Sequence, residues 1–307
     1  MPLAETSGEV LPSFVDRHGW LRVHGGHLVD ESGEIVVLRG VSLFWSQWMP
    51  QFYNPQLIKW LRDDWKVNVV RASMAVHQGG FLENPVDEVK KIETVIAAAL
   101  RYGLYVIVDW HAHLCELPAA RDFFVDIARR YARFPNLIFE PWNEPDAKYD
   151  WSADIKPYHE AVIHAVRRHD PRRLFILGTE NFSQRVDKAA LDPVGDTNAA
   201  YTLHFYAANH KAKLRQRLSD ALAHGAGVVV TEYGTCEASG DGYFDVAETR
   251  RWWDFLQARH VSYINWSISD KTETAAVLNA NAASTGGWTD SDLTPSGRLI
   301  REHLRRA

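Results

Sequence analysis

Two glutamates of this sequence follow or end apolar segments, where a carboxylate can exchange protons or attack a substrate. Glu144 lies shortly after residues 137–140, and Glu232 ends residues 228–232. Cleavage of a glycosidic bond with retention needs one carboxyl group that protonates the leaving oxygen and a second that attacks the anomeric carbon, about 5 to 5.5 Å apart. Taken singly, each glutamate could equally be a solvated carboxylate or half of an ion pair.

Further polar and aromatic residues stand at or just beyond the ends of other apolar segments. Carboxylate, imidazole, guanidinium and indole groups can hold a sugar and tune two catalytic carboxylates. These residues are Arg71, Asp109, His111, Asn143, His204, Tyr206 and Trp266.

Eight apolar, β-branched segments alternate with amphipathic stretches along the chain. The predicted strands are residues 36–42, 67–72, 105–110, 137–140, 174–178, 201–205, 228–232 and 262–266. The predicted helices are residues 54–65, 86–102, 118–134, 155–169, 211–224, 246–260 and 296–305, with a short helix in residues 184–191. This alternation predicts an α/β fold, a (β/α)8 TIM barrel, whose active site lies at the carboxyl ends of the strands.

A doubly wound open sheet is the alternative fold, but residues 40–44 lack the glycine-rich turn that usually follows its first strand. Ahead of the barrel, residues 21–29 and 35–37 flank the turn signal Asp30-Glu31-Ser32-Gly33, which predicts a small hairpin. We expect a single catalytic domain over residues 1–307, with an irregular segment at residues 1–16.

Composition limits the classes of partner. The chain has 307 residues and a formal net charge of −5 without a basic stripe, so nucleic acid is not an expected partner. No apolar run reaches the roughly 18 residues of a membrane span, and residues 1–10 lack the pattern of a secretory signal. Cys115 and Cys236 are the two cysteines, and we expect both to be free thiols.

Several motifs together resemble glycoside hydrolase family 5, the large cellulase family, from about residue 17 to residue 304. The two that carry the glutamates are Trp142-Asn143-Glu144-Pro145 and Thr231-Glu232-Tyr233-Gly234. The others, in matching order, are Val69-Val70-Arg71, Asp109-Trp110-His111, Leu203-His204-Phe205-Tyr206 and Asn265-Trp266-Ser267-Ile268-Ser269-Asp270-Lys271.

The resemblance implies that Glu144 is the general acid/base and Glu232 the nucleophile. It implies that Arg71 and Tyr206 donate hydrogen bonds to Glu232, and such donors favour an ionised carboxylate. Glu144 is expected to keep its proton near neutral pH in the free enzyme and to fall in pKa once Glu232 is glycosylated.

The resemblance also implies roles for four supporting residues. Asn143 is the expected partner of the sugar 2-hydroxyl, and Trp266 forms the floor under the reacting sugar. His111 and His204 are expected to hold the substrate and the catalytic glutamates in place. The plain alternatives are a loop-capping amide, barrel packing and satisfied structural histidines.

The segment from residue 266 to residue 288 resembles the bacterial endo-β-1,4-glucanase branch of the family. That likeness implies that Lys271, Glu273 and Trp48 bind a sugar on the non-reducing side, and an indole suits the flat apolar faces of a β-1,4-glucan. The pattern departs from the branch at Phe44, where a His is frequent, and at Phe182, where many relatives place a Trp on the leaving-group side. Residues 112–117 form a short loop, which suggests an open cleft.

The sequence therefore predicts a retaining endo-β-1,4-glucanase, or cellulase, that acts on β-1,4-glucan and cello-oligosaccharides. The same chemistry on mannan, xyloglucan, mixed-linkage glucan or chitosan stays open. Two other classes are a non-catalytic carbohydrate-binding barrel and a metal-dependent hydrolase built on His111 and His113. We expect no cofactor, no metal and no membrane partner, a monomer, and a secreted or periplasmic location that follows from the polymeric substrate.

Overall fold

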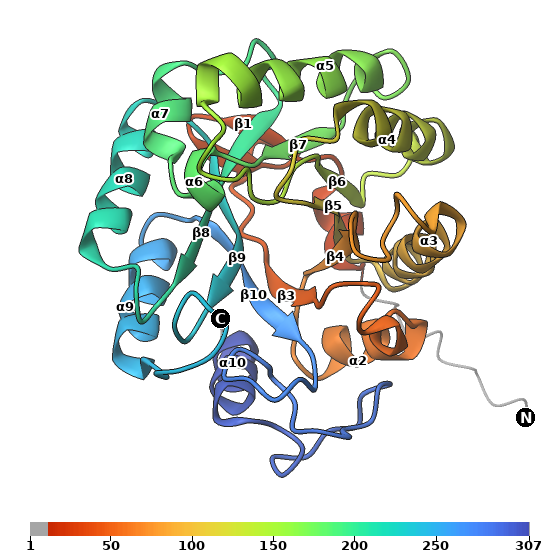
Figure 1. The fold of residues 1–307 in the computed structure, drawn as a ribbon, viewed down its shortest axis with the longest axis vertical. Helices are drawn as coiled ribbons and strands as arrows, with labels where there is room; N and C mark the ends of the chain where they lie inside the picture. The colour runs from red at the N-terminus through yellow and green to blue at the C-terminus, as the bar shows by residue number, and fades with distance from the viewer. Residues whose placement is uncertain (1–11, 307) are drawn as a thin grey trace, which may run out of the picture.

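The structure, a computed structural model, describes residues 12–306 and contains a closed barrel of eight parallel strands in the order β10-β3-β4-β5-β6-β7-β8-β9. Figure 1 shows helices around the outside of this barrel. The strands are β3 (Arg39–Leu43), β4 (Val69–Ala75), β5 (Tyr105–His111), β6 (Leu137–Glu140), β7 (Leu174–Leu177), β8 (Ala199–Tyr206), β9 (Val228–Gly234) and β10 (Ser262–Ile268). The predicted (β/α)8 TIM barrel is confirmed.

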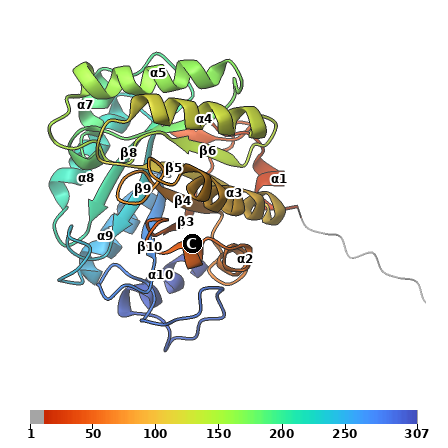
Figure 2. The same ribbon diagram turned by 45° about the vertical axis from the view of Figure 1, so that its right-hand side comes forward.

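The helices follow the strands as the apolar spacing predicts, with small differences at their ends. They are α2 (Pro55–Asp63), α3 (Pro85–Tyr102), α4 (Leu117–Tyr131), α5 (Lys156–Arg167), α6 (Glu180–Ser183), α7 (Val186–Leu191), α8 (Ala212–Ala223), α9 (Val246–Gln257) and α10 (Pro295–Arg306). A 3-10 turn at Pro50–Phe52 precedes α2, and a π-helical turn at Trp151–Ile155 precedes α5. Figure 2 shows α4 and α5 side by side on the outside of the barrel. Among the described residues, no helix combines the length and the apolar character that crossing a membrane requires.

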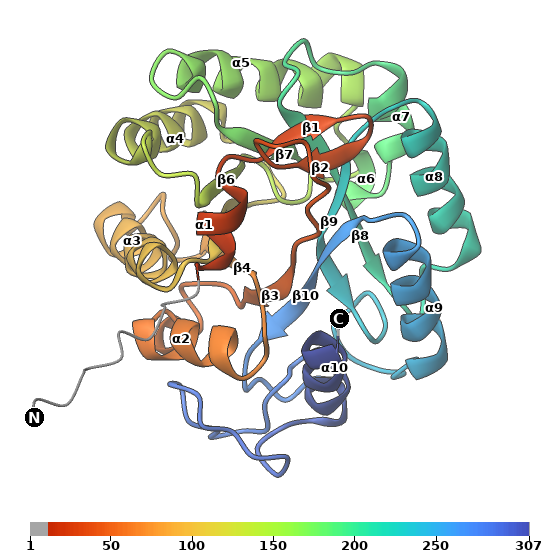
Figure 3. The same cartoon turned by 180° about the vertical axis from the view of Figure 1, so that it is seen from behind.

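A hairpin and a short helix close the amino-terminal end of the barrel, and both are visible in Figure 3. Strand β1 (Arg22–His24) pairs antiparallel with β2 (His27–Val29), and the Val23 amide donates to Asn198 Oδ1 just before β8. The predicted hairpin exists, but its turn lies at Gly25 and Gly26 rather than at Asp30–Gly33. Both glycines have positive φ, 58° and 82°, which suits the tight two-residue turn of a hairpin.

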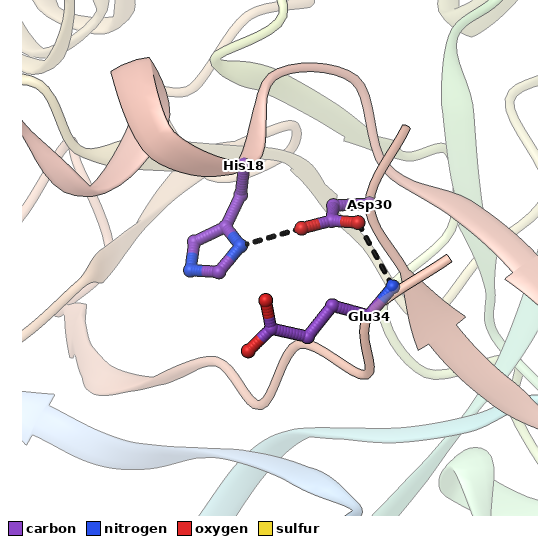
Figure 4. Close-up of side chains that lie close together, drawn as sticks. All are labelled: His18, Asp30 and Glu34. Carbon is purple, nitrogen blue, oxygen red and sulfur yellow. Dashed lines mark hydrogen bonds and ion pairs between the residues drawn. The ribbon is translucent and has the colours of Figure 1, made fainter. Parts of the chain in front are cut away.

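The Asp30 carboxylate organises the second turn (Figure 4). It accepts hydrogen bonds from the amides of Ser32 and Glu34 and lies 2.9 Å from His18 Nδ1. Residues 35–37 consequently form a single bridge from Ile35 to Val29 rather than a strand.

His18 ends helix α1 (Phe14–His18), which Ser13 and Asp16 cap at its start. Most of the segment expected to be irregular, residues 1–16, lies outside the described residues. From Phe14 it is helical.

The barrel interior and the layer between strands and helices are apolar. Every residue of β4, β5, β9 and β10 is buried, because helices cover their outer faces and side chains fill the interior. Cys115 and Cys236 are free thiols, as predicted. The polar residues within this apolar frame gather at the carboxyl ends of the strands.

Candidate active site at the carboxyl ends of the strands

A fully buried guanidinium joins four strands at the base of the site. Arg71 Nε and Nη2 donate to the two oxygens of Glu140, at 2.8 and 3.2 Å. Nη2 also lies 3.0 Å from Asp109 Oδ2, and Nη1 donates to Glu232 Oε2 at 3.1 Å. One side chain of β4 thus contacts carboxylates of β5, β6 and β9.

Asp109 and Glu140 both contact Arg71, but their pKa values are shifted in opposite directions. Burial raises the pKa of Asp109 well above its usual range, in spite of Arg71 and with Glu140 adding to the effect. Burial also opposes ionisation of Glu140, but Arg71 and the nearby imidazole of His204, whose Nε2 lies 3.8 Å from Oε1, outweigh it and lower the pKa of Glu140 to about 2. Glu140 is therefore the permanent anion that balances Arg71.

Glu232 has two donors, and they are the two that the sequence predicts. Arg71 Nη1 reaches Oε2, and the Tyr206 hydroxyl donates to Oε1 at 2.8 Å. Burial, and after it the nearby charge of Glu232, raise the pKa of Tyr206 well above its usual value, so this phenol keeps its proton to donate. Only 6% of the Glu232 side chain is exposed.

Glu144 lies opposite Glu232 and contacts histidines instead. One oxygen of Glu144 and one of Glu232 lie within 4.8 Å of each other. His204 Nδ1 is 2.9 Å from Glu144 Oε1, and His113 Nδ1 is 3.5 Å from Oε2. The two carboxylates consequently face a common space with different partners.

The prediction that Glu144 keeps its own proton in the free protein is wrong. Burial raises its pKa, but the hydrogen bond and charge of His204 outweigh burial and lower it. Burial lowers the pKa of His204, yet Glu140, Glu144 and Glu232 together raise it to about 9. At neutral pH the shared proton therefore lies mainly on the imidazole.

His111 has a different environment from the one that the resemblance implies. Its Nδ1 lies 2.6 Å from Asp109 Oδ2, and its ring stacks on Trp266 with centroids 5.0 Å apart and planes at 5°. Burial and Arg71 lower its pKa to about 3, so it is neutral. His111 thus supports Trp266, and among its described contacts there is no hydrogen bond to Glu144 or Glu232. Asn143 Oδ1 accepts from Arg71 Nη2 at 2.6 Å.

One side of the glutamate pair carries the residues implied for a non-reducing sugar. A depression of about 250 Å³ is lined by Trp48, Trp266, Lys271 and Glu273 among others. Trp48 is 51% exposed, and Lys271 forms an ion pair with Glu273. Phe44 lies beneath, with its ring 5.3 Å from Trp266 and 5.5 Å from Lys271 Nζ.

The other side is a second depression of about 380 Å³. Phe182, Gln184 and His210 line it together with His113 and both glutamates. Phe182 is 36% exposed and meets the His113 ring edge-on at 6.0 Å. The structure therefore brings all the predicted site residues to the rim or the base of one continuous region.

Sequence reasoning missed several members of this site. The sequence predicts Glu140 only as the end of a strand, although a charge that closes the apolar run Leu137–Glu140 signals a buried partner. Thr231 Oγ1, which donates to Glu140 at 2.7 Å and lies 2.9 Å from His204 Nε2, gives no comparable signal. For His113 the sequence suggests only a role as a metal ligand.

Two groups of described residues have the ligand types and spacing of a metal site. One is Glu144, His204 and Glu232, and the other is His18, Asp30 and Glu34. Neither contains His111, whose Nδ1 is taken by Asp109, so the pair His111 and His113 does not meet a third ligand among the residues described. In the second group, the Asp30 oxygens already contact the amides of Ser32 and Glu34 and the His18 ring (Figure 4).

Comparisons with known proteins agree with this geometry. Residues 29–272 match the model of the family described as Cellulase (glycosyl hydrolase family 5). The chain is 40% identical over 93% of its length to an endoglucanase of Clostridium saccharobutylicum and 41% identical over 95% to endoglucanase N of Pectobacterium atrosepticum. It spans 65% and 66% of the length of these relatives, less than two thirds.

Two solved structures are similar over nearly their whole length. A structure from Cytophaga hutchinsonii has 48% identity and a TM-score of 0.95, and 96% of this chain and 97% of that chain are covered. The catalytic domain of an endoglucanase from Thermobifida fusca, in complex with cellotetraose, has 34% identity and a TM-score of 0.90, with 95% and 99% covered.

Proposed function

Because this chain belongs to glycosyl hydrolase family 5, the cellulase family, we propose that it is a retaining endo-β-1,4-glucanase that cleaves internal bonds by double displacement. The observation that carries this proposal is the pair of carboxylates within 4.8 Å of each other that have opposite kinds of partner. Glu232 is held by a cation and a hydroxyl donor, whereas Glu144 shares a proton with an imidazole.

In the first step Glu232 attacks the anomeric carbon and forms an ester with it. The bond between that carbon and the leaving oxygen breaks as Glu144 delivers a proton to this oxygen. Arg71 and Tyr206 hold the Glu232 oxygens, so the attacking carboxylate has a fixed orientation. The proton on Glu144 comes from the pair that it forms with His204, 2.9 Å away.

In the second step a water enters the side vacated by the leaving group, Glu144 accepts its proton, and the water oxygen attacks the anomeric carbon as the ester bond to Glu232 breaks. The charge of Glu232 is one of the causes that raise the pKa of His204. Once Glu232 is esterified that charge is gone, so the pair of His204 and Glu144 holds its proton less tightly. This change favours the switch of Glu144 from acid to base.

Three residues around the reacting sugar have proposed roles. Asn143 is the partner of the 2-hydroxyl: its Oδ1 is occupied by Arg71, which leaves Nδ2 as the end that donates to the sugar. Trp266, stacked on His111, is the floor of this subsite. Trp48 with Lys271 and Glu273 binds the sugar on the non-reducing side, and Phe182 lines the leaving-group side.

The proposed substrate is β-1,4-glucan and its cello-oligosaccharides, and the chemistry requires no cofactor or metal. The exposed indole of Trp48 supports a flat glucan, since a sugar with equatorial hydroxyls offers apolar faces for stacking. The proposed place of action is outside the cytoplasm, because a polymeric substrate cannot enter the cell. The proposed oligomeric state is a monomer.

Reducing-end release from carboxymethylcellulose, mixed-linkage glucan, mannan and chitosan tests the proposal, with Glu144→Gln and Glu232→Gln as matched inactive controls. We expect the glucans to be cleaved and NMR to show the β-anomer first. A first-formed α-anomer would refute retention, and activity on mannan alone would refute the glucanase. Glucan binding without any released ends would identify a non-catalytic barrel.

A further inference from the structure

Three consecutive residues after β7 have the left-handed backbone conformation. The φ angles of Asn181, Phe182 and Ser183 are 59°, 57° and 56°. L-residues other than glycine avoid this region, and Asn is the most tolerant of the three. Such a turn persists only where its surroundings fix it, and strained backbone of this kind gathers at functional sites.

The turn at residues 181–183 is bonded to the loop that carries Glu144. The Ser183 hydroxyl donates to the Asn143 carbonyl at 2.7 Å, and the Phe182 amide donates to the Pro145 carbonyl at 2.9 Å. These carbonyls belong to the residues immediately before and after Glu144. A regular right-handed turn would direct these two donors differently.

The opposite side of the same loop is fixed to the loop after β5. The Glu144 amide donates to the Ala112 carbonyl at 3.2 Å, and the Asp146 amide donates to the His113 carbonyl at 3.1 Å. Gly178, at the end of β7, lies so close that a Cβ there would be 2.0 Å from the Trp142 carbonyl oxygen. The backbone of Glu144 is therefore clamped from both sides.

We infer that the left-handed turn at residues 181–183 positions the Glu144 carboxyl for proton transfer, with the Ser183 hydroxyl as the positioning group. Ser183 is fully buried and does not face the substrate depression, so it acts through the peptide of Asn143 and Glu144. The Thr179 amide, which donates to Ser183 Oγ at 3.2 Å, orients that hydroxyl. This inference rests on the proposed function, because it gives Glu144 the role of acid.

Two aryl β-cellobiosides separate this role from a general loss of structure. Phenol has a pKa near that of tyrosine, about 10, so phenyl β-cellobioside needs a proton from Glu144 to release its aglycone. Dinitrophenolate is a far better leaving group and departs without that proton. The ratio of the two kcat/KM values, measured on one preparation, does not depend on how much of the protein is folded.

Ser183→Ala should lower kcat/KM for phenyl β-cellobioside by roughly tenfold or more and leave that for dinitrophenyl β-cellobioside within about twofold. Ser183→Gly, which tolerates the positive φ but also lacks the hydroxyl, should give the same ratio. Ser296→Ala is the matched control, since it removes an equally buried hydroxyl that lies 2.8 Å from Thr235 Oγ1, and it should leave the ratio unchanged.

An equal loss on both substrates would overturn the inference, because Ser183 would then have only a structural role. A wild-type ratio in Ser183→Gly would also overturn it, because the hydroxyl would not be needed. A wild-type protein that cleaves neither aryl glycoside nor glucan would instead refute the proposed function itself.

Discussion

The proton shared by His204 and Glu144 leads to a prediction about the pH dependence of activity. His204→Gln keeps a side chain that can donate to Glu144 Oε1, 2.9 Å away in the wild type, and removes the ionisable ring. In the wild type the pair loses its last proton near the pKa of His204, which is raised from 6.5 to about 9. That rise corresponds to about 3 kcal/mol of stabilisation of the protonated pair.

The basic limb of kcat/KM reports the loss of this proton from the free enzyme, so we expect it near pH 9 in the wild type. In His204→Gln only the carboxyl group of Glu144 remains to hold the proton. The basic limb of the variant should therefore lie about two pH units or more below that of the wild type. At pH 8 the variant should therefore be roughly tenfold or more less active than at its own optimum.

The assay is the pH profile of kcat/KM on cellotetraose for the wild type and the variant. His113→Gln is the control, because it removes an imidazole that lies 3.5 Å from the other oxygen of Glu144 and is 40% exposed, and its limb should move little. A basic limb in His204→Gln within half a pH unit of that of the wild type would refute the shared proton.

Three further predictions follow from single contacts. Tyr206→Phe removes the donor 2.8 Å from Glu232 Oε1, and a hydrogen bond to a charged group is worth about 1.5 to 3 kcal/mol, so kcat/KM on cellotetraose should fall roughly ten- to a hundredfold; an unchanged value would refute the role of this hydroxyl. Trp48→Ala removes an indole that is 51% exposed and should raise KM for cello-oligosaccharides about tenfold with little change in kcat, so an equal fall in kcat would contradict a pure binding role. Burial opposes ionisation of Asp30, but hydrogen bonds from Ser32 and His18 lower its pKa to about 2, so its stabilising effect is full above about pH 4 and is lost as the pH falls through about 2. Asp30→Asn should therefore cost about 2 kcal/mol in urea unfolding at pH 7 and clearly less at pH 3, and an equal cost at both pH values would contradict this.

The barrel could be predicted because its strands are short apolar runs that stand out from the helical spacing between them. The same reasoning located Glu144 and Glu232, since residues at the carboxyl ends of parallel strands meet at one edge. The hairpin was predicted with the wrong turn. Asp30–Gly33 does form a turn, but β1 and β2 are joined at the two consecutive glycines Gly25 and Gly26, and the segment after Asp30–Gly33 adds only the bridge from Ile35 to Val29.

The electrostatics of the site could not be predicted from residue types. Whether Glu144 holds its proton depends on His204, which lies 60 residues away in the chain, and on the three carboxylates that raise the pKa of that histidine. Ser183 shows the same limit for geometry. A serine in a loop carries no sign that its hydroxyl will hold the peptide next to the acid.

The ionic cluster around Arg71 has a consequence for how this chain could be divided. Arg71, Asp109, Glu140 and Glu144 belong to the half-barrel that runs from β3 to β6, whereas Glu232 and its donor Tyr206 belong to the half from β7 to β10. Neither half alone holds both carboxylates or satisfies all the charges of the cluster. Two fragments cut between α5 and β7 should each be inactive, and hydrolysis would return only when they reassemble, which makes activity a direct reporter of barrel closure.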